Sequence, residues 1–269
     1  MLAKLSVDQA LIKAKSYAKK GEVAEAEKIY LSILKNFSKN QRALKGLESL
    51  NYVKGKNDSK GLPQEIINEL LKLHNKGDSL SVFHRSQILT KQYPDSFILW
   101  NIFGVSAAQL KKFEKAIDAF KKSISLKPDY AEAYNNLGNV FKDQGKLDEA
   151  INAYKNSISL KPDYIEAYLN FGITSINLGK IDDAIKSFKT ITLIKPDYAE
   201  AFNKLGFAFQ EQGKFEDAIE AYKKYISIVP NNAFAYYNLG NVLQKQDKFN
   251  YAIDAYNEAI KINPNYAEA

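Results

Sequence analysis

The prolines of this 269-residue chain recur at one spacing. Six of the seven lie 34 residues apart, and the seventh lies 31 residues before the first of them. A repeat period of about 20 to 50 residues is typical of proteins in which short supersecondary units stack side by side. Such an array works through an extended surface, so the period predicts a binding surface rather than an enclosed pocket. The prolines are Pro63, Pro94, Pro128, Pro162, Pro196, Pro230 and Pro264.

Small and aromatic residues keep the same register as the prolines. With proline at position 32 of each unit, position 8 is glycine, position 20 is alanine, and positions 4 and 24 are aromatic in five consecutive units. Apolar residues at positions 4, 7 and 11 have the spacing of one helix face, and a second such stripe follows a short turn. We therefore expect an all-α fold, an α-solenoid of stacked antiparallel helix pairs. The six units are 63–96, 97–130, 131–164, 165–198, 199–232 and 233–266.

The two ends of the chain depart from this register. Residues 7–40 resemble a divergent further unit, with Gly21 in phase, and 41–50 would continue as one more helix. We expect residues 1–50 to form a divergent basic head and the polar segment 51–62 to form a linker. The array then occupies 63–269. It ends with the opening of another unit and no capping helix, which suggests either a longer chain or self-association through the uncapped end.

Composition narrows the class of protein. The chain has no cysteine, so it can form neither a disulfide nor a thiolate metal site. No apolar run approaches the roughly 20 residues that span a bilayer, and the N-terminus does not read as a signal peptide. We expect a cytoplasmic protein that needs no cofactor.

The net charge of +7 lies in the N-terminal segment. Residues 1–62 hold 13 lysines and arginines against 6 acidic residues, whereas residues 63–269 hold 25 of each. A basic head can dock on an acidic partner, an anionic lipid surface or nucleic acid. The other interpretation is a lysine-rich solvated helix face. We favour this second interpretation, since the lysines alternate with glutamates and Arg42 is the one arginine there.

The pattern of the units, W/Y-x2-L/F-G followed by A-x3-F/Y and then P, resembles the tetratricopeptide repeat. It covers 97–266 closely and 63–96 more loosely, where Leu70 and Val82 replace the small residues. The resemblance implies a right-handed superhelix whose first helices face the concave side. It also implies a protein or peptide ligand.

Asparagine recurs at positions 5, 6 and 9, which the resemblance places in or beside the concave groove. An asparagine amide donates two hydrogen bonds and accepts others, so a ladder of amides can hold a peptide backbone. The repeat arms of O-linked N-acetylglucosamine transferases carry such a ladder, and residues 131–150 are similar to them. Lys204 interrupts the position-6 ladder, and the alternative is that asparagine is a neutral surface residue. The predicted peptide-binding residues are Asn101, Asn135, Asn136, Asn139, Asn170, Asn203, Lys204, Asn238 and Asn241.

Other kinds of site find little support in the sequence. A cluster of cations that clamps a peptide carboxylate would need more than the isolated Lys142 and Lys204. The two histidines, His74 and His84, are spaced for different helices, with no carboxylate pattern around them. The array is charge-neutral, which disfavours nucleic-acid binding, and we expect no catalytic or metal residues and no membrane partner.

Three hypotheses on function remain at this point. The chain is an interaction scaffold that binds an extended peptide or a partner protein in its groove. Alternatively, it is the substrate-presenting arm of a larger bacterial transferase, such as a glycosyltransferase, sulfotransferase or methyltransferase. The third hypothesis is a structural protein that assembles end to end.

Overall fold

The structure, a computed structural model, describes residues 6–20, 22–54 and 62–265. These residues form fifteen helices and no strand, which confirms the all-α prediction. The chain divides into two compact units, residues 1–136 and 137–269, with the boundary inside α8. The helices are α1 Val7–Lys19, α2 Val23–Asn36, α3 Gln41–Lys54, α4 Gln64–Asn75, α5 Ser79–Gln92, α6 Phe97–Gln109, α7 Phe113–Leu126, α8 Ala131–Asp143, α9 Leu147–Leu160, α10 Ile165–Asn177, α11 Ile181–Ile194, α12 Ala199–Glu211, α13 Phe215–Ile228, α14 Ala233–Lys245 and α15 Phe249–Ile262.

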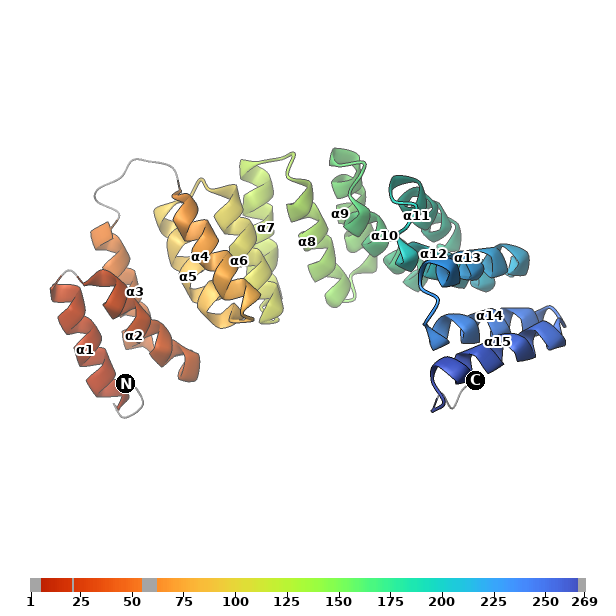
Figure 1. Ribbon diagram of the computed structural model, residues 1–269. Helices are drawn as coiled ribbons and strands as arrows, with labels where there is room; N and C mark the ends of the chain where they lie inside the picture. Colours follow the sequence, from red (N-terminus) through yellow and green to blue (C-terminus); the bar gives the residue numbers. More distant parts are fainter. Residues whose placement is uncertain (1–5, 21, 55–61, 266–269) are drawn as a thin grey trace. The chain divides into compact units, whose positions relative to one another are not determined.

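Consecutive helices pack as the hairpins that the repeat predicts (Figure 1). In the first compact unit α6 packs on α7. In the second compact unit α10 packs on α11, α12 on α13 and α14 on α15. Each of these pairs also contacts a neighbour, for example α11 with α12 and α13 with α14. The second helix of each pair ends two residues before the periodic proline, because proline cannot continue a helix. Within each unit the chain is thus a stack of helix pairs.

The seam inside a pair is a contact between an aromatic ring and a glycine. A Cβ atom built on Gly172 in α10 would lie 2.5 Å from Cε1 of Phe188 in α11, whose side chain is fully buried. Side chains do not approach so closely, so only glycine permits this separation of the two helices. The same ring stands over the glycine in the pairs Gly104–Phe120, Gly138–Tyr154, Gly206–Tyr222 and Gly240–Tyr256.

The turn between the two helices of a pair needs a residue with positive φ. Gly145 has a φ of 75°, and the following Lys146 N–H donates to the carbonyl of Phe141, which satisfies the end of α8. Two of the 34-residue repeat units lack this glycine and have Lys111 (φ 55°) and Asp247 (φ 57°) in its place. Side chains other than glycine rarely adopt this conformation, so the surrounding turn imposes it.

The first three helices pack against the array. Their core contains Leu11, Tyr30 and Leu47, all nearly inaccessible, and also Ile88 from α5. The predicted linker is shorter than expected, because α3 continues to Lys54 and makes residues 51–54 helical. Residues 55–61 and Gly21 lie outside the described residues. The division of the chain into head, linker and array otherwise stays a prediction.

An ion-pair network joins three of these helices. Arg85 in α5 lies with its Nε 3.6 Å from Oε1 of Glu27 in α2, and its guanidinium also pairs with Glu69 in α4. The side chains of Arg85 and Glu27 are each only 12% exposed. Water therefore screens this pair poorly, and it fixes α2 against α5.

The last helix exposes the face that inner second helices bury. Ile253 of α15 is 56% exposed, whereas the equivalent Ile219 of α13 is 8% exposed beneath α14. Phe249 and Ile260 are exposed beside Ile253. The four residues at the C-terminus, which include part of the opening of another unit, lie outside the described residues.

We expect Gly172→Leu to destabilise the protein by about 3 kcal/mol, since the new side chain must displace the buried ring of Phe188. Urea unfolding measures this change. The control is Asn177→Leu on an exposed position of the same helix, where a change within about 0.5 kcal/mol is expected. A Gly172→Leu effect as small as the control would contradict the close approach.

Arg85→Ala removes the guanidinium that lies 3.6 Å from the largely buried carboxylate of Glu27, and this should cost about 3 kcal/mol. Hydrogen exchange should then speed up in α1, α2 and α3 before the rest of the chain. Arg42→Ala is the matched control, because its pair with Asp8 is 59% and 72% exposed and is worth about 1 kcal/mol or less. Equal effects of the two variants would show that the buried pair does not hold the first helices.

Candidate functional site

The candidate site is the face of the first helices that carries positions 5, 6 and 9 of each unit, here called the asparagine face. Successive helix residues are about 100° apart, so these positions point away from the buried stripe at positions 4, 7 and 11. The position-6 residues are half-buried in every unit from 97–130 onward. Three of them are amides, Asn136, Asn170 and Asn238, and half-burial leaves part of each side chain accessible.

In the first compact unit, the predicted amides bond to one another. Asn136 Nδ2 donates to Asn101 Oδ1 at 3.1 Å, and Asn101 Nδ2 lies 3.5 Å from the hydroxyl of Tyr130. This short chain links position 6 of one helix to position 5 of the preceding first helix. The structure therefore brings these two predicted residues together.

Asn135 does not belong to this face. Its exposed fraction is 0%, so its amide cannot reach a ligand, and we remove it from the predicted set. Asn101 and Asn203 hold the same repeat position and are half-buried, so the full burial is particular to Asn135.

In the second compact unit, two position-9 amides are held by tyrosines. Tyr154 donates its hydroxyl hydrogen to Oδ1 of Asn139 at 2.8 Å, and Tyr256 does the same to Asn241, also at 2.8 Å. Both tyrosines are the ring residues of the glycine seam. Burial raises the pKa of Tyr154 above its usual value, so the hydroxyl keeps its proton and remains a donor.

The remaining predicted residues of the second unit are half-buried on the same face. Asn170 lies on α10, Asn203 and Lys204 on α12, and Asn238 on α14. Among the described residues, the side chains of Asn203, Lys204 and Asn238 make no hydrogen bond or ion pair. Their polar groups are therefore available to a ligand.

Two exposed aromatic side chains of the first helices, one on the asparagine face and one at position 2, were not predicted as binding residues. Phe207 at position 9 of its unit is 41% exposed, and Phe234 at position 2 of the next is 50% exposed. Exposed aromatic side chains are common binding anchors. The signal in the sequence was an aromatic residue at positions where the other units carry aliphatic or polar residues.

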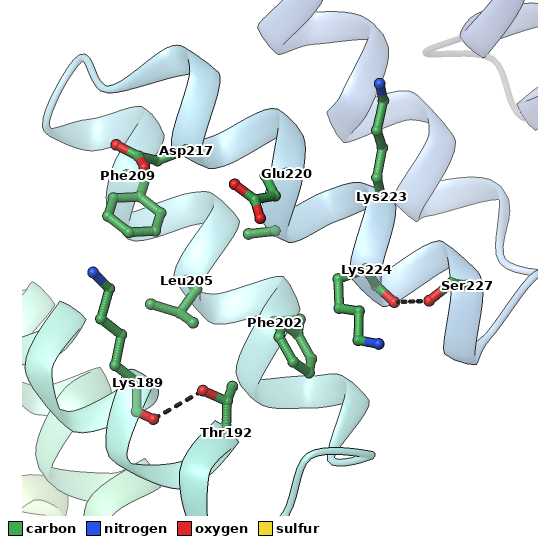
Figure 2. Close-up of a pocket in the computed structure, with 11 residues that line it drawn as sticks. Lys189, Thr192, Phe202, Leu205, Phe209, Asp217, Glu220, Lys223, Lys224 and Ser227 are labelled. Atoms are coloured by element: carbon green, nitrogen blue, oxygen red, sulfur yellow. Dashed lines mark hydrogen bonds between the residues drawn. The ribbon is translucent and has the colours of Figure 1, made fainter.

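A cleft lies on the opposite side of α12 (Figure 2). Its floor is made by Phe202, Leu205 and Phe209 at positions 4, 7 and 11, and its volume is about 670 Å³. Lys189 of α11 lies with Nζ 5.3 Å from the centre of the Phe209 ring, while α13 supplies the charges of Asp217 and Glu220. Sequence reasoning did not identify this cleft, because its lining residues are the core positions of the repeat.

The same cleft recurs one unit later. It is smaller, about 540 Å³, and the equivalent residues line it after a shift of 34 positions: Tyr236, Leu239, Leu243 and Lys223 replace Phe202, Leu205, Phe209 and Lys189. Both clefts are therefore consequences of the repeat geometry on the side away from the asparagine face.

The two histidines lie on different helices. His74 lies on α4 and His84 on α5, as predicted, and no group of three or more His, Cys, Asp or Glu in the described part of the chain could hold a metal ion. His84 is 7% exposed, and its ring meets Phe83 edge-on at 5.4 Å between centroids. Burial, with the nearby charges of Lys112 and Lys115, lowers the pKa of His84.

Family comparisons agree with the geometry. A family model described as TPR repeat matches residues 107–145, 138–174, 176–213 and 209–247, and one described as tetratricopeptide repeat matches 233–266. These matches cover more than half of the chain. The chain belongs to the tetratricopeptide repeat family. The matched repeats run from 107 to 266 apart from residue 175, and such an array of repeats is an interaction scaffold.

Solved structures show the same fold. A crystal structure of MamA protein is 27% identical, with a TM-score of 0.60 over 64% of this chain and 94% of that one. YrrB, titled a TPR protein with an unusual peptide-binding site, is 18% identical, with a TM-score of 0.60 over 68% of this chain and 94% of that one. MamA from Desulfovibrio magneticus RS-1 is 17% identical, with a TM-score of 0.58 over 64% and 97%. At the two lower identities the likeness shows the fold alone.

One curated relative matches over a short segment. The peroxisomal targeting signal receptor of Candida albicans (strain SC5314 / ATCC MYA-2876) is 47% identical over 45 residues, which is 17% of this chain and 8% of that protein. The match therefore covers little more than one repeat. Among the described residues, no helix is long and apolar enough to cross a membrane.

The lowered pKa of His84 predicts a pH-dependent stability. Folding favours the neutral imidazole of His84. The contribution of His84 to the free energy of unfolding is therefore complete above the pKa of 6.5 that it has in the unfolded chain, and it is lost as the pH falls below this value. Urea unfolding at pH 7.5 and pH 5 should show a smaller loss of stability on acidification for His84→Leu than for the unaltered chain. Equal losses would show that His84 does not titrate differently in the folded state.

Proposed function

We propose that the chain binds an extended peptide, or an extended segment of a partner protein, through its asparagine face. The family makes the chain an interaction scaffold, and the asparagine face is its surface best suited to a peptide backbone. The observation that carries the proposal is the recurrence of half-buried amides at position 6, namely Asn136, Asn170 and Asn238.

Amides suit an extended ligand because a peptide backbone offers both a carbonyl and an N–H at each residue. An asparagine can donate to the first and accept from the second without reading the side chain between them. Lys204 takes the place of asparagine at position 6 of the repeat 199–232. Its ammonium group can donate hydrogen bonds but cannot accept them. The face is therefore not a uniform ladder.

The exposed aromatics add a preference to this backbone recognition. Phe207 and Phe234 expose apolar surface on the first helices of the second compact unit, near the polar side chains at position 6. A peptide with an apolar side chain opposite Phe207 buries surface that a wholly polar peptide leaves exposed. We therefore expect ligands of mixed composition with at least one large apolar residue.

Removing the position-6 amides should weaken binding. The probe is the tightest 12-residue peptide recovered from a fully randomised display library selected on the whole chain. We expect the triple variant Asn136→Ala, Asn170→Ala and Asn238→Ala to bind it at least about tenfold more weakly, since each lost hydrogen bond is worth roughly 1 kcal/mol.

The matched control removes three asparagines from exposed positions of the second helices, Asn152, Asn156 and Asn257. Isothermal titration should give this control the affinity of the unaltered chain. If the control and the position-6 variant lost affinity equally, or if neither did, the asparagine face would not be the binding surface.

A further inference from the structure

The residue at position 9 of a unit varies with the ring residue at position 24. Where position 24 is phenylalanine, position 9 is aliphatic, as in Val105 with Phe120 and Ile173 with Phe188. Asparagine occupies position 9 only where position 24 is tyrosine, in Asn139 with Tyr154 and Asn241 with Tyr256. The hydrogen bonds of 2.8 Å explain this pairing, because only tyrosine brings a hydroxyl to the amide.

Each of these tyrosine rings packs closely on the glycine of its own helix pair. A Cβ on Gly138 would lie 2.5 Å from Cε1 of Tyr154, and one on Gly240 would lie 2.5 Å from Cε1 of Tyr256. Each ring is thus seated on a glycine within the seam, and its hydroxyl projects to the asparagine face. The hydroxyl position is set by the packing of the helix pair rather than by a flexible side chain.

A fixed hydroxyl fixes the orientation of the amide. The tyrosine hydroxyl donates to Oδ1 of Asn139 and of Asn241, which occupies one lone pair of the amide oxygen and leaves Nδ2 with both of its hydrogens. Such a group can donate to a carbonyl oxygen. Gln244 also comes within 3.3 Å of the Tyr256 hydroxyl, but the shorter contact is to Asn241.

We infer that Tyr154 and Tyr256 are positioning residues that turn Asn139 and Asn241 into carbonyl-binding groups for a bound peptide. The inference rests on the proposed peptide-binding function and specifies how it works at these two rungs. Between them, position 9 holds Ile173 and Phe207. Along the second compact unit, the position-9 residues are therefore an N–H donor (Asn139), two apolar side chains and a second N–H donor (Asn241).

The chain supplies a matched control for this role. Tyr222 is the same seam residue, buried over Gly206, but position 9 of its unit is Phe207, which has no amide to orient. Tyr222→Phe therefore removes a tyrosine hydroxyl from an equivalent glycine–ring contact without affecting any position-9 amide. Any effect on packing alone should then be shared by all three tyrosines.

The test measures the affinity of the 12-residue peptide selected on the whole chain. We expect Tyr154→Phe with Tyr256→Phe to weaken binding about three- to tenfold, and Tyr222→Phe to leave it unchanged. In a background that already carries Asn139→Ala and Asn241→Ala, the two tyrosine changes should have no further effect, because the amides that they orient are gone. Such non-additivity is not expected of a purely structural role.

Three outcomes would overturn the inference. They are an unchanged affinity of the double tyrosine variant, an equal loss in Tyr222→Phe, or a full additional loss in the background without the two amides. If the position-6 variant still loses affinity in these cases, the proposed function stands and only the role of the tyrosines fails. If the position-6 variant also binds as the unaltered chain does, both fail.

Discussion

The contact of an aromatic ring with a helical glycine determines how this chain folds. It brings the two helices of a pair closer than any side chain at position 8 would permit, as Phe188 over Gly172 shows. Since this contact recurs every 34 residues, each pair has the same construction and can pack on the next one. The same contact turns the apolar stripe of the first helix inward, and positions 6 and 9 outward.

This arrangement separates two surfaces of different chemistry on α12. The asparagine face presents amides, one lysine and Phe207, all suited to a peptide backbone with an occasional apolar side chain. The opposite side holds a cleft with an apolar floor and charged walls, made by residues that the repeat needs for packing. The ring of Tyr154 packs on Gly138 inside the helix pair, and its hydroxyl donates a hydrogen bond to Asn139 on the asparagine face.

The sequence predicted those features that depend on residue type at a repeated position. Gly172 and Phe188 meet as expected, and Gly145 ends its helix with positive φ. Features that depend on which atoms meet were not predicted. The sequence does not reveal that Arg85 reaches Glu27, because the two are 58 residues apart in unlike surroundings. The burial of Asn135 was missed because the repeat position alone does not distinguish it from Asn101 and Asn203, which hold the same position and are half-buried.

Hydrogen exchange measured with and without the selected peptide distinguishes the asparagine face from the cleft as the binding surface. If the asparagine face binds the ligand, protection on binding should increase in the first helices of the second unit, α10, α12 and α14. The second helices α11 and α13, which form the walls of the cleft in Figure 2, should keep their exchange rates. Protection confined to α11 and α13 would place the ligand on the opposite side and contradict the account.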